Sequence, residues 1–317
     1  MGSYLDARDY KLVYDDSENT INLKDTIKID INRLLSIHLY GDVSFEIDKG
    51  YSYKQKFADN FDNISQKIEE VIKGGNGEEF IKWLEDPFRK IFKGPDKILE
   101  NKGKFKQHID NLSKKNDLSP INKFNNDTPD FIWDILNAFP EDKKINDGQK
   151  LWIPDDSISN KAFSDRIKDT VEFLDGRWFE WYVYSQIKNK LEGELKEGEL
   201  KEGEHFGISL EAHKKNSPNF ELDIYIVNGY QLIGISLTTS KRQGECKLKG
   251  FEVIHRVRQI GGDESKAILI TGMNSSKKND LQKDLAYVTG TTEDKIVVFG
   301  VDDWTNIGDK ICEEVFR

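Results

Sequence analysis

Residues 220–237 read FELDIYIVNGYQLIGISL, and this stretch decides the fold. It contains two extended apolar runs joined through Asn228-Gly229, a pair typical of a tight β-hairpin turn. Another extended run, over residues 206–212, precedes them. The three runs together predict an antiparallel meander of three strands.

After the meander, the sequence alternates between helical and strand patterns. Strands separated by helices of this length imply crossover connections on a mixed sheet. Two further helices are expected before the meander, over residues 160–175 and 177–190. The later helices are expected over residues 245–260, 278–288 and 304–316, and the later strands over residues 267–271 and 295–299.

The first half of the chain has a mostly helical pattern. Its apolar residues recur at spacings of three and four, with Lys and Asp between them, which is typical of amphipathic helices. We expect a short hairpin around residues 10–23 and helices over residues 29–39, 61–72, 78–92 (kinked at Pro87), 96–112 and 131–138. The expected fold class is α+β or α/β, with a mostly helical domain over residues 1–159 and a mixed sheet flanked by helices over residues 160–317.

Composition narrows the classes of function. The 317 residues include 47 Lys plus Arg and 57 Asp plus Glu, so the formal charge is 47 − 57 = −10. This balance excludes a chain that is basic all over, so any surface for nucleic acid must be local. Two cysteines cannot build a structural zinc site alone, and their low number suits a reducing cytosol.

Several familiar segments are absent from the sequence. No apolar run reaches the roughly 18 residues of a membrane helix, and the N-terminus lacks the pattern of a signal peptide. We therefore expect a cytoplasmic protein with no membrane partner. The sequence also lacks a glycine-rich phosphate loop, an HExxH helix and a Gly-x-Ser-x-Gly elbow, which removes those chemistries.

Two carboxylates occupy unusual positions. Glu180 lies among bulky aromatic residues of an expected helix, where an unpaired buried charge is costly. Asp223 lies inside an expected strand, where Asp is disfavoured. Each is either an ordinary paired or solvent-facing acid or a member of a functional site. Alternation along the strand places Glu221, Asp223 and Tyr225 on one face, and Leu222, Ile224 and Ile226 on the other.

The helix expected over residues 245–260 carries a polar stripe. At about 100° per residue, Lys247 points nearly opposite to Lys249. Between Lys241 and Arg258 the chain has six Lys or Arg and two Glu, a local charge of 6 − 2 = +4. This face is either merely solvated or faces a phosphate, which basic residues neutralise while carboxylates hold a divalent cation. The stripe consists of Glu245, Lys249, Glu252, Arg256 and Gln259.

Three motifs in the second half carry a resemblance to a known family. They are Gly-x-Trp-Phe-Glu at 176–180, Glu-Leu-Asp at 221–223, and Lys-x-Lys-Gly-Phe-Glu with Arg-x-Arg-Gln-Ile-Gly-Gly-Asp at 247–263. In this order they resemble the PD-(D/E)XK nuclease superfamily over residues 160–317. The closer likeness is to the nuclease module of type III CRISPR ancillary effectors, which is joined there to a cyclic-oligoadenylate-sensing CARF domain. The resemblance implies a restriction-endonuclease-like core and a metal-dependent endonuclease of antiviral defence.

The resemblance also implies roles for individual residues. The acid of the family's first helix corresponds to Glu180 and its strand Asp to Asp223, and these two would bind Mg²⁺ or Mn²⁺. The family's usual Glu-x-Lys strand corresponds here to a segment with Ser236 and Thr238. Either the site is inactive, or the acid and lysine have moved to the next helix as Glu252 and Lys249, the interpretation we favour. The expected contacts to nucleic acid, whether DNA or RNA, are Lys241, Arg242, Lys247, Arg256 and Gln259.

The resemblance bears on partners as well. Nucleases that resemble this chain often pair two sites in a homodimer. The first half lacks the alternating strands and helices of a cyclic-oligoadenylate-sensing domain, so such a domain would be absent from this chain. The opening Met1-Gly2-Ser3 suits either a piece of a longer protein or a natural start.

Two other functions compete with the nuclease. One is a catalytically degenerate module that kept the fold and binds nucleic acid or serves in assembly. The other is a protein–protein adaptor in the helical half, with Trp83, Trp133 and Trp152 at a partner face. For each of these tryptophans, an ordinary place in the core or at its edge is the interpretation we favour.

Overall fold

The chain forms two compact units. The computed structural model describes residues 14–15, 20–21, 29–38, 46–49, 51–92, 119–154, 157–194, 200–213 and 220–316. Unit 1 consists of residues 1–53 and 179–317, and unit 2 of residues 54–178. Unit 2 is therefore inserted into the sequence of unit 1.

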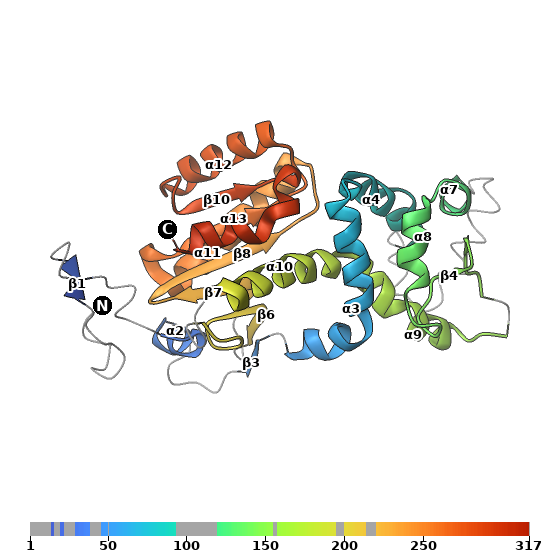
Figure 1. Cartoon of the computed structure of the whole chain (residues 1–317), viewed down its shortest axis with the longest axis horizontal. Helices are drawn as coiled ribbons and strands as arrows, with labels where there is room; N and C mark the ends of the chain where they lie inside the picture. The colour runs from blue at the N-terminus through green and yellow to red at the C-terminus, as the bar shows by residue number, and fades with distance from the viewer. Residues whose placement is uncertain are drawn as a thin grey trace. The chain divides into compact units, whose positions relative to one another are not determined.

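Unit 1 contains a six-stranded mixed sheet with the strand order β10-β9-β8-β7-β6-β3 (Figure 1). Strands β8, β9 and β10 run parallel, and the remaining neighbours pair antiparallel. The predicted fold class and the predicted meander are thus confirmed. The strands are β3 (Glu46–Lys49), β6 (Phe206–His213), β7 (Phe220–Asn228), β8 (Gln231–Leu237), β9 (Lys266–Ile270) and β10 (Ile296–Phe299), with a separate pair β1 (Tyr14–Asp15) and β2 (Thr20–Ile21).

Helices cover both faces of this sheet. One face packs against α2, α11 and α12, which share a core cluster with β6–β10. Helices α10 and α13 pack against each other at the other face, where a Cβ at Gly308 of α13 would lie 2.7 Å from the Gln186 carbonyl oxygen of α10 (Figure 1). The helices are α2 (Ile31–His38), α10 (Trp178–Glu194), α11 (Gln243–Gly261), α12 (Ser275–Thr289) and α13 (Ile307–Phe316), with short turns at Gly262–Glu264 and Val301–Asn306. None of the described helices is long and apolar enough to cross a membrane.

Glycines let α11 approach both the sheet and its neighbouring helix. A Cβ at Gly234 of β8 would lie 2.2 Å from Val257 Cγ1 of α11, far inside contact distance. A Cβ at Gly250 of α11 would lie 2.6 Å from a methyl carbon of Leu285 on α12. These close contacts fix the position of α11 over β8, and with it the side chains that α11 presents.

The side-chain alternation predicted along β7 fails at one place. Tyr225 lies in the core cluster beneath α11 together with Leu222, whereas Ile224 is outside that cluster. Positions three apart lie on opposite faces of a regular strand. The predicted grouping of Tyr225 with Glu221 and Asp223 on one face is therefore wrong.

An ionic cluster around the buried Asp303 joins α12 and α13 to the turn after β10. Asp303 lies 4% exposed and accepts hydrogen bonds from Lys278, from Lys310 at 2.5 Å and from the Gly300 backbone N–H at 2.8 Å. Burial works to raise the pKa of Asp303, but the hydrogen bonds from the two lysines and from Gly300 outweigh it and hold the pKa below its ordinary 3.8. The carboxylate thereby ties α12 and α13 to one loop.

The described residues of unit 2 form helices and one small hairpin. Its elements are α3 (Tyr51–Lys73, beginning in unit 1), α4 (Gly77–Trp83), a π-helical segment at Leu84–Phe88, α5 (Arg89–Phe92), α7 (Ser119–Asn126), α8 (Asp130–Asn137), β4 (Asn146–Asp147), β5 (Lys150–Leu151), α9 (Asn160–Glu172) and a π-helical turn at Phe173–Arg177. The predicted kink near Pro87 is confirmed, with non-helical backbone at Asp86. Ser119-Pro120 begins α7, since proline is tolerated in the first turn of a helix. The helix predicted over residues 96–112 lies outside the described residues.

Two of the three tryptophans considered for a partner face belong to the core of unit 2. Trp83 and Trp133 are each 4% exposed, and Trp83 Nε1 donates to Thr128 Oγ1 at 2.8 Å. Trp152 is half-buried, stacks on Phe163 and lies 3.8 Å under the Arg166 guanidinium. Trp83 and Trp133 therefore serve packing, and the predicted adaptor face loses both of them.

The two units differ from the predicted division at residue 159/160. Helix α9 belongs to unit 2, where Thr170 Oγ1 donates to the Lys143 carbonyl at 2.7 Å. Strand β3 belongs to the sheet of unit 1, because its backbone pairs with β6 from Glu46↔His213 to Lys49↔Leu210. Contacts between residues that are far apart in the sequence therefore decide which unit α9 and β3 belong to.

The Asp303 cluster generates a stability prediction. Asp303→Asn should lower the free energy of unfolding by about 2–3 kcal/mol at neutral pH, because it removes charge-assisted hydrogen bonds from a buried group. The folded pKa of Asp303 is depressed, so its contribution is complete above the unfolded pKa and declines as the pH falls through the folded one. Urea unfolding from neutral pH down to about pH 2.5 should show the difference between the two proteins shrinking.

Asp309→Asn is the matched control for this measurement. Asp309 pairs with Lys190 at 2.5 Å but is 48% exposed, so its loss should cost under about 1 kcal/mol. Equal losses for the two variants, or a difference that does not depend on pH, would contradict the role given to Asp303.

Candidate functional site

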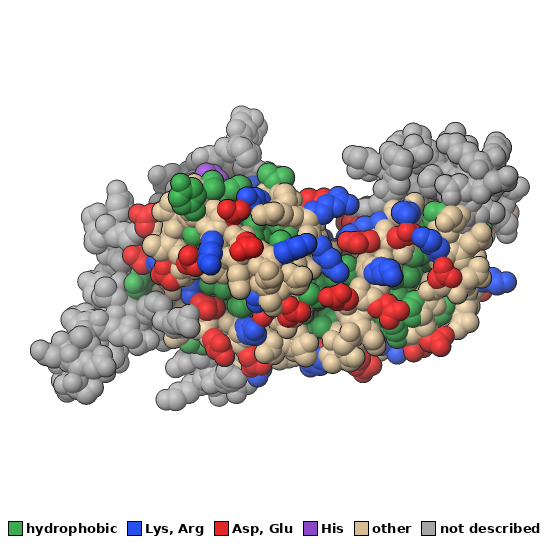
Figure 2. Space-filling model, turned by 90° about the horizontal axis from the view of Figure 1, so that it is seen from above, with side chains coloured by type: hydrophobic (Ala, Val, Ile, Leu, Met, Phe, Trp, Pro, Cys, Tyr) green, Lys and Arg blue, Asp and Glu red, His purple; other side chains and the backbone are tan. Residues whose placement is uncertain are grey.

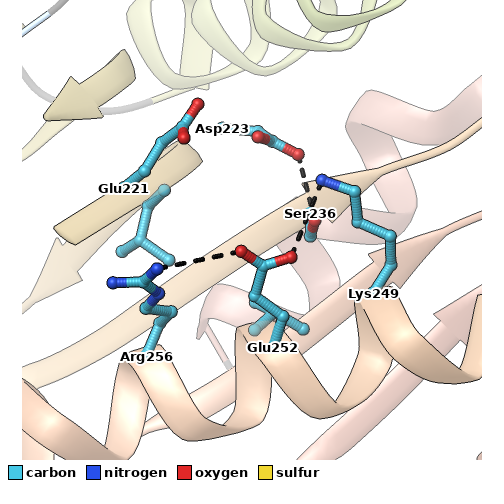
Figure 3. Close-up of a pocket in the computed structure, with 8 residues that line it drawn as sticks. Glu221, Asp223, Ser236, Lys249, Glu252 and Arg256 are labelled. Atoms are coloured by element: carbon cyan, nitrogen blue, oxygen red, sulfur yellow. Dashed lines mark hydrogen bonds and ion pairs between the residues drawn. The ribbon is translucent and has the colours of Figure 1, made fainter. Parts of the chain in front are cut away.

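A small pocket opens where β7 and β8 part. The β7–β8 pairing runs from Asn228↔Gln231 to Ile224↔Ile235, and the pocket lies beyond that last pair. Three elements line it (Figure 3). The lining residues are Glu221, Leu222 and Asp223 of β7, Ser236 of β8, and Lys249, Glu252, Val253 and Arg256 of α11.

Asp223 bridges the gap between the two strands. Its Oδ2 accepts a hydrogen bond from the Leu237 backbone N–H at 2.8 Å and another from Ser236 Oγ at 3.0 Å. The carboxylate thus replaces the backbone acceptor that a continuing ladder would supply to Leu237. Two donors fix the orientation of this half-buried carboxylate within the pocket.

Helix α11 supplies the other charged groups. Lys249, Glu252 and Arg256 rise from one face of the helix toward the strands (Figure 3). Lys249 Nζ lies 3.8 Å from Glu252 Oε2, and the Arg256 guanidinium lies 3.9 Å from Glu252 Oε1. Glu252 is 47% exposed and Lys249 42%, so these long ion pairs are weak and easily rearranged.

The structure brings together four of the residues singled out in the sequence. Asp223, Lys249, Glu252 and Arg256 line one pocket, as the helical phase of α11 and its place after the meander led us to expect. Glu180 is half-buried on α10 and is not one of the pocket-lining residues. Its role as a metal ligand stays a prediction.

The remaining residues predicted to contact nucleic acid lie outside the pocket lining. Lys247 forms an ion pair with Asp284 of α12 at 2.6 Å, on the side away from Lys249 that helical phase predicts. Arg242 pairs with Glu245 at 2.7 Å at the start of α11. Lys241 and Gln259 are exposed and lie outside the pocket lining. Contacts of these four residues to nucleic acid stay predictions.

Two polar residues of the pocket, Glu221 and Ser236, were not selected as site residues in the sequence. Glu221 stands in the Glu-Leu-Asp motif, and that motif was the available signal; its carboxylate points away from α11 (Figure 3). Ser236 was noted only as a departure from the family pattern. Its hydroxyl donates a hydrogen bond to the Asp223 carboxylate, and the sequence gives no signal for this role.

Electrostatics make the pocket unsuited to a bare phosphate. Its lining has two cations, Lys249 and Arg256, and three carboxylates, Glu221, Asp223 and Glu252, a formal charge of 2 − 3 = −1. On the face seen in Figure 2, basic and acidic side chains are likewise interspersed. A divalent cation would change the charge of the pocket to +1, which favours an anion.

The donor set suits Mg²⁺ or Mn²⁺ with few protein ligands. Mg²⁺ is ordinarily held by one or two carboxylates, with waters and substrate phosphates completing its shell. Among the described residues, no three His, Cys, Asp or Glu side chains form a group that could hold a metal ion. Asp223 with one further carboxylate of the pocket, Glu221 or Glu252, is therefore the donor set that fits.

The hydrogen bonds of Asp223 generate a stability prediction that needs no metal. Asp223→Ala leaves the Leu237 N–H without its acceptor and should cost about 1–3 kcal/mol in the free energy of unfolding. Asp223→Asn keeps an oxygen acceptor and should cost under about 1 kcal/mol. Urea unfolding in EDTA compares the two, and equal costs would mean that Asp223 does not support β8.

Comparisons with known proteins add little beyond this geometry. No family model and no curated protein matches the chain. One of the solved structures that match is protein VC1899 from Vibrio cholerae, with a TM-score of 0.45 and 14% sequence identity. The alignment covers 90% of this chain and 61% of VC1899, so the chain spans about three fifths of that protein. A likeness at this level carries no argument about the site or its chemistry.

Proposed function

We propose that this chain is a metal-dependent phosphodiesterase that cleaves nucleic acid at the pocket between β7, β8 and α11. The observation that carries the proposal is that Asp223, Lys249 and Glu252 line one pocket. The motif resemblance of residues 160–317 to a CRISPR-linked nuclease module supports the same reaction and adds a role in antiviral defence to the proposal.

The cation would be Mg²⁺ or Mn²⁺. Asp223, with Glu221 or Glu252, would hold it, and Glu180 is a further candidate ligand from the sequence. When bound, the ion would supply Lewis-acid chemistry, favouring attack by water and neutralising phosphate charge. The pocket charge of −1 supports a requirement for the ion, because without it the three carboxylates repel a phosphodiester.

The chain's own residues have separable roles in this proposal. The Lys249 ammonium stabilises the extra negative charge that develops on the phosphate in the transition state. Its flexible four-carbon stem can reach an anion from a helix as well as from a strand. Ser236 and the Leu237 N–H hold the Asp223 carboxylate in place, and Glu252 keeps Lys249 and Arg256 near the pocket until a phosphate displaces it.

A degenerate nucleic-acid-binding module is the second candidate. The observation that favours it is the engagement of the pocket's carboxylates. Asp223 already accepts two hydrogen bonds, and Glu252 stands between two cations. In such a module these contacts are permanent, and binding is governed by basic side chains with no requirement for a metal.

Cleavage assays separate the two candidates. Purified protein should cleave at least one of labelled single- or double-stranded DNA or RNA with Mg²⁺ or Mn²⁺, and none of them with EDTA. Asp223→Asn should abolish cleavage, because it removes a charged ligand but keeps the hydrogen bond to Leu237. Wild-type activity in this variant would remove Asp223 from the chemistry, and metal-independent binding without cleavage would favour the second candidate.

The lysine assignment has its own matched pair of variants. Lys249→Ala should slow cleavage by about 10²-fold or more with metal binding retained, because it removes a transition-state contact. Lys247→Ala should change the rate little, since Lys247 is paired with Asp284 on the side facing α12. Equal and normal rates for both variants would place the cationic role elsewhere, for example at Lys241.

A further inference from the structure

Ser209 has an unusual backbone for a strand residue. Among the described residues, it is the one non-glycine residue with a positive φ, at 52°, and it lies in the middle of β6. An L-residue in this left-handed region clashes through its Cβ, which makes it uncommon outside turns. Such conformations persist where the surrounding structure requires them, and they concentrate at functional sites.

Ser209 stands opposite Asp223. The β6–β7 register pairs Ile208 with Ile224 and Leu210 with Leu222, so the position between them brings Ser209 against Asp223. This position is missing from an otherwise continuous set of pairs. The irregular backbone of β6 and the candidate metal ligand of β7 are thus one local feature of the sheet.

Both strands change face at this position. A Cβ at Gly207 would point into the Tyr225 ring, and Tyr225 lies in the α11-side cluster. Leu210 of β6 and Leu222 of β7 lie in the same cluster, although they are three positions away from these residues. A regular ladder would put them on the opposite face.

The change of face determines where Asp223 points. With unbroken alternation, Asp223 would share the face of Tyr225 and enter the apolar core beneath α11, and Leu222 would leave that core. With the interruption, Leu222 stays in the core, and the Asp223 carboxylate lies in the gap where it meets Leu237 and Ser236.

We infer that Ser209 is a positioning residue, whose left-handed backbone interrupts the β6–β7 ladder and thereby aims Asp223 into the pocket. The inference deepens the proposed function, since Asp223 is the ligand on which that function rests. It assigns a site role to a residue of a strand that contributes nothing to the pocket lining.

The test reads the Leu237 amide, which reports on Asp223 without any metal or substrate. Protein labelled with ¹⁵N-leucine gives one amide resonance for Leu237, assigned by its loss in Leu237→Met. Asp223→Ala defines the resonance position without the carboxylate acceptor. Ser209→Gly should keep the wild-type position, because glycine adopts positive φ readily. In Ser209→Val, the Leu237 resonance should move toward its position in Asp223→Ala, because a β-branched residue disfavours a left-handed backbone.

Ile208→Val is the matched control in the same strand. It trims a buried side chain without changing the backbone requirement and should keep the wild-type Leu237 resonance. Mn²⁺ affinity by calorimetry should fall about 10-fold or more in Ser209→Val and stay unchanged in Ile208→Val. If Ser209→Val does not fold, Ser209→Thr, which is also β-branched but keeps the hydroxyl, is expected to shift the Leu237 resonance in the same direction.

The outcomes separate this inference from the proposed function. A folded Ser209→Val or Ser209→Thr protein with the wild-type Leu237 resonance would overturn the positioning role. If the wild type binds no Mn²⁺ and cleaves nothing while Ser209→Val still shifts Leu237, the proposed function fails and the positioning role stands.

Discussion

Every backbone donor of β8 needs an acceptor, because all seven residues of this strand are buried. Strand β9 satisfies one side of β8 in parallel register from Ile233↔Lys266 to Leu237↔Ile270. Strand β7 satisfies the other side only as far as Ile235, and from there the Asp223 carboxylate serves Leu237. The pocket therefore exists because a side chain takes over where a strand stops pairing. The hydrogen bond from the Leu237 N–H also fixes the orientation of the Asp223 carboxylate, on which the proposed chemistry depends.

The arrangement of charges around this carboxylate is adapted to change. Glu252 lies between Lys249 and Arg256 at distances near the outer limit of ion pairing, and all three side chains reach solvent. Weak exposed pairs are rearranged at little cost. By contrast, two lysines hold the buried Asp303 carboxylate tightly in the same unit. The two clusters show how burial separates a fixed structural contact from one that a ligand can replace.

The sequence predicts the parts of this structure that are governed by local rules. Asn228-Gly229 specifies the hairpin between β7 and β8, and helical phase places Lys249 with Glu252 and opposite Lys247. Strand β3 could not be predicted, because Glu-Ile-Asp-Lys at 46–49 has no strand pattern and gains its conformation by pairing with the distant β6. The sequence also does not predict that Asp223 and Tyr225 lie on different faces of the sheet. This arrangement depends on a left-handed serine in another strand, and serine at that position carries no such signal.

The insertion of unit 2 between Tyr53 and Phe179 has a consequence for dissecting the protein. A fragment cut at residue 160 would lose β3 and leave the backbone groups of β6 along one side without partners. An unprotected edge of this kind is a template for intermolecular strand pairing and aggregation. The same cut would also separate α9 from the rest of unit 2, to which it belongs. A shorter protein made of unit 1 alone, residues 1–53 and 179–317, would instead contain every strand of the sheet, including its edge strand β3, and the gap that Asp223 spans.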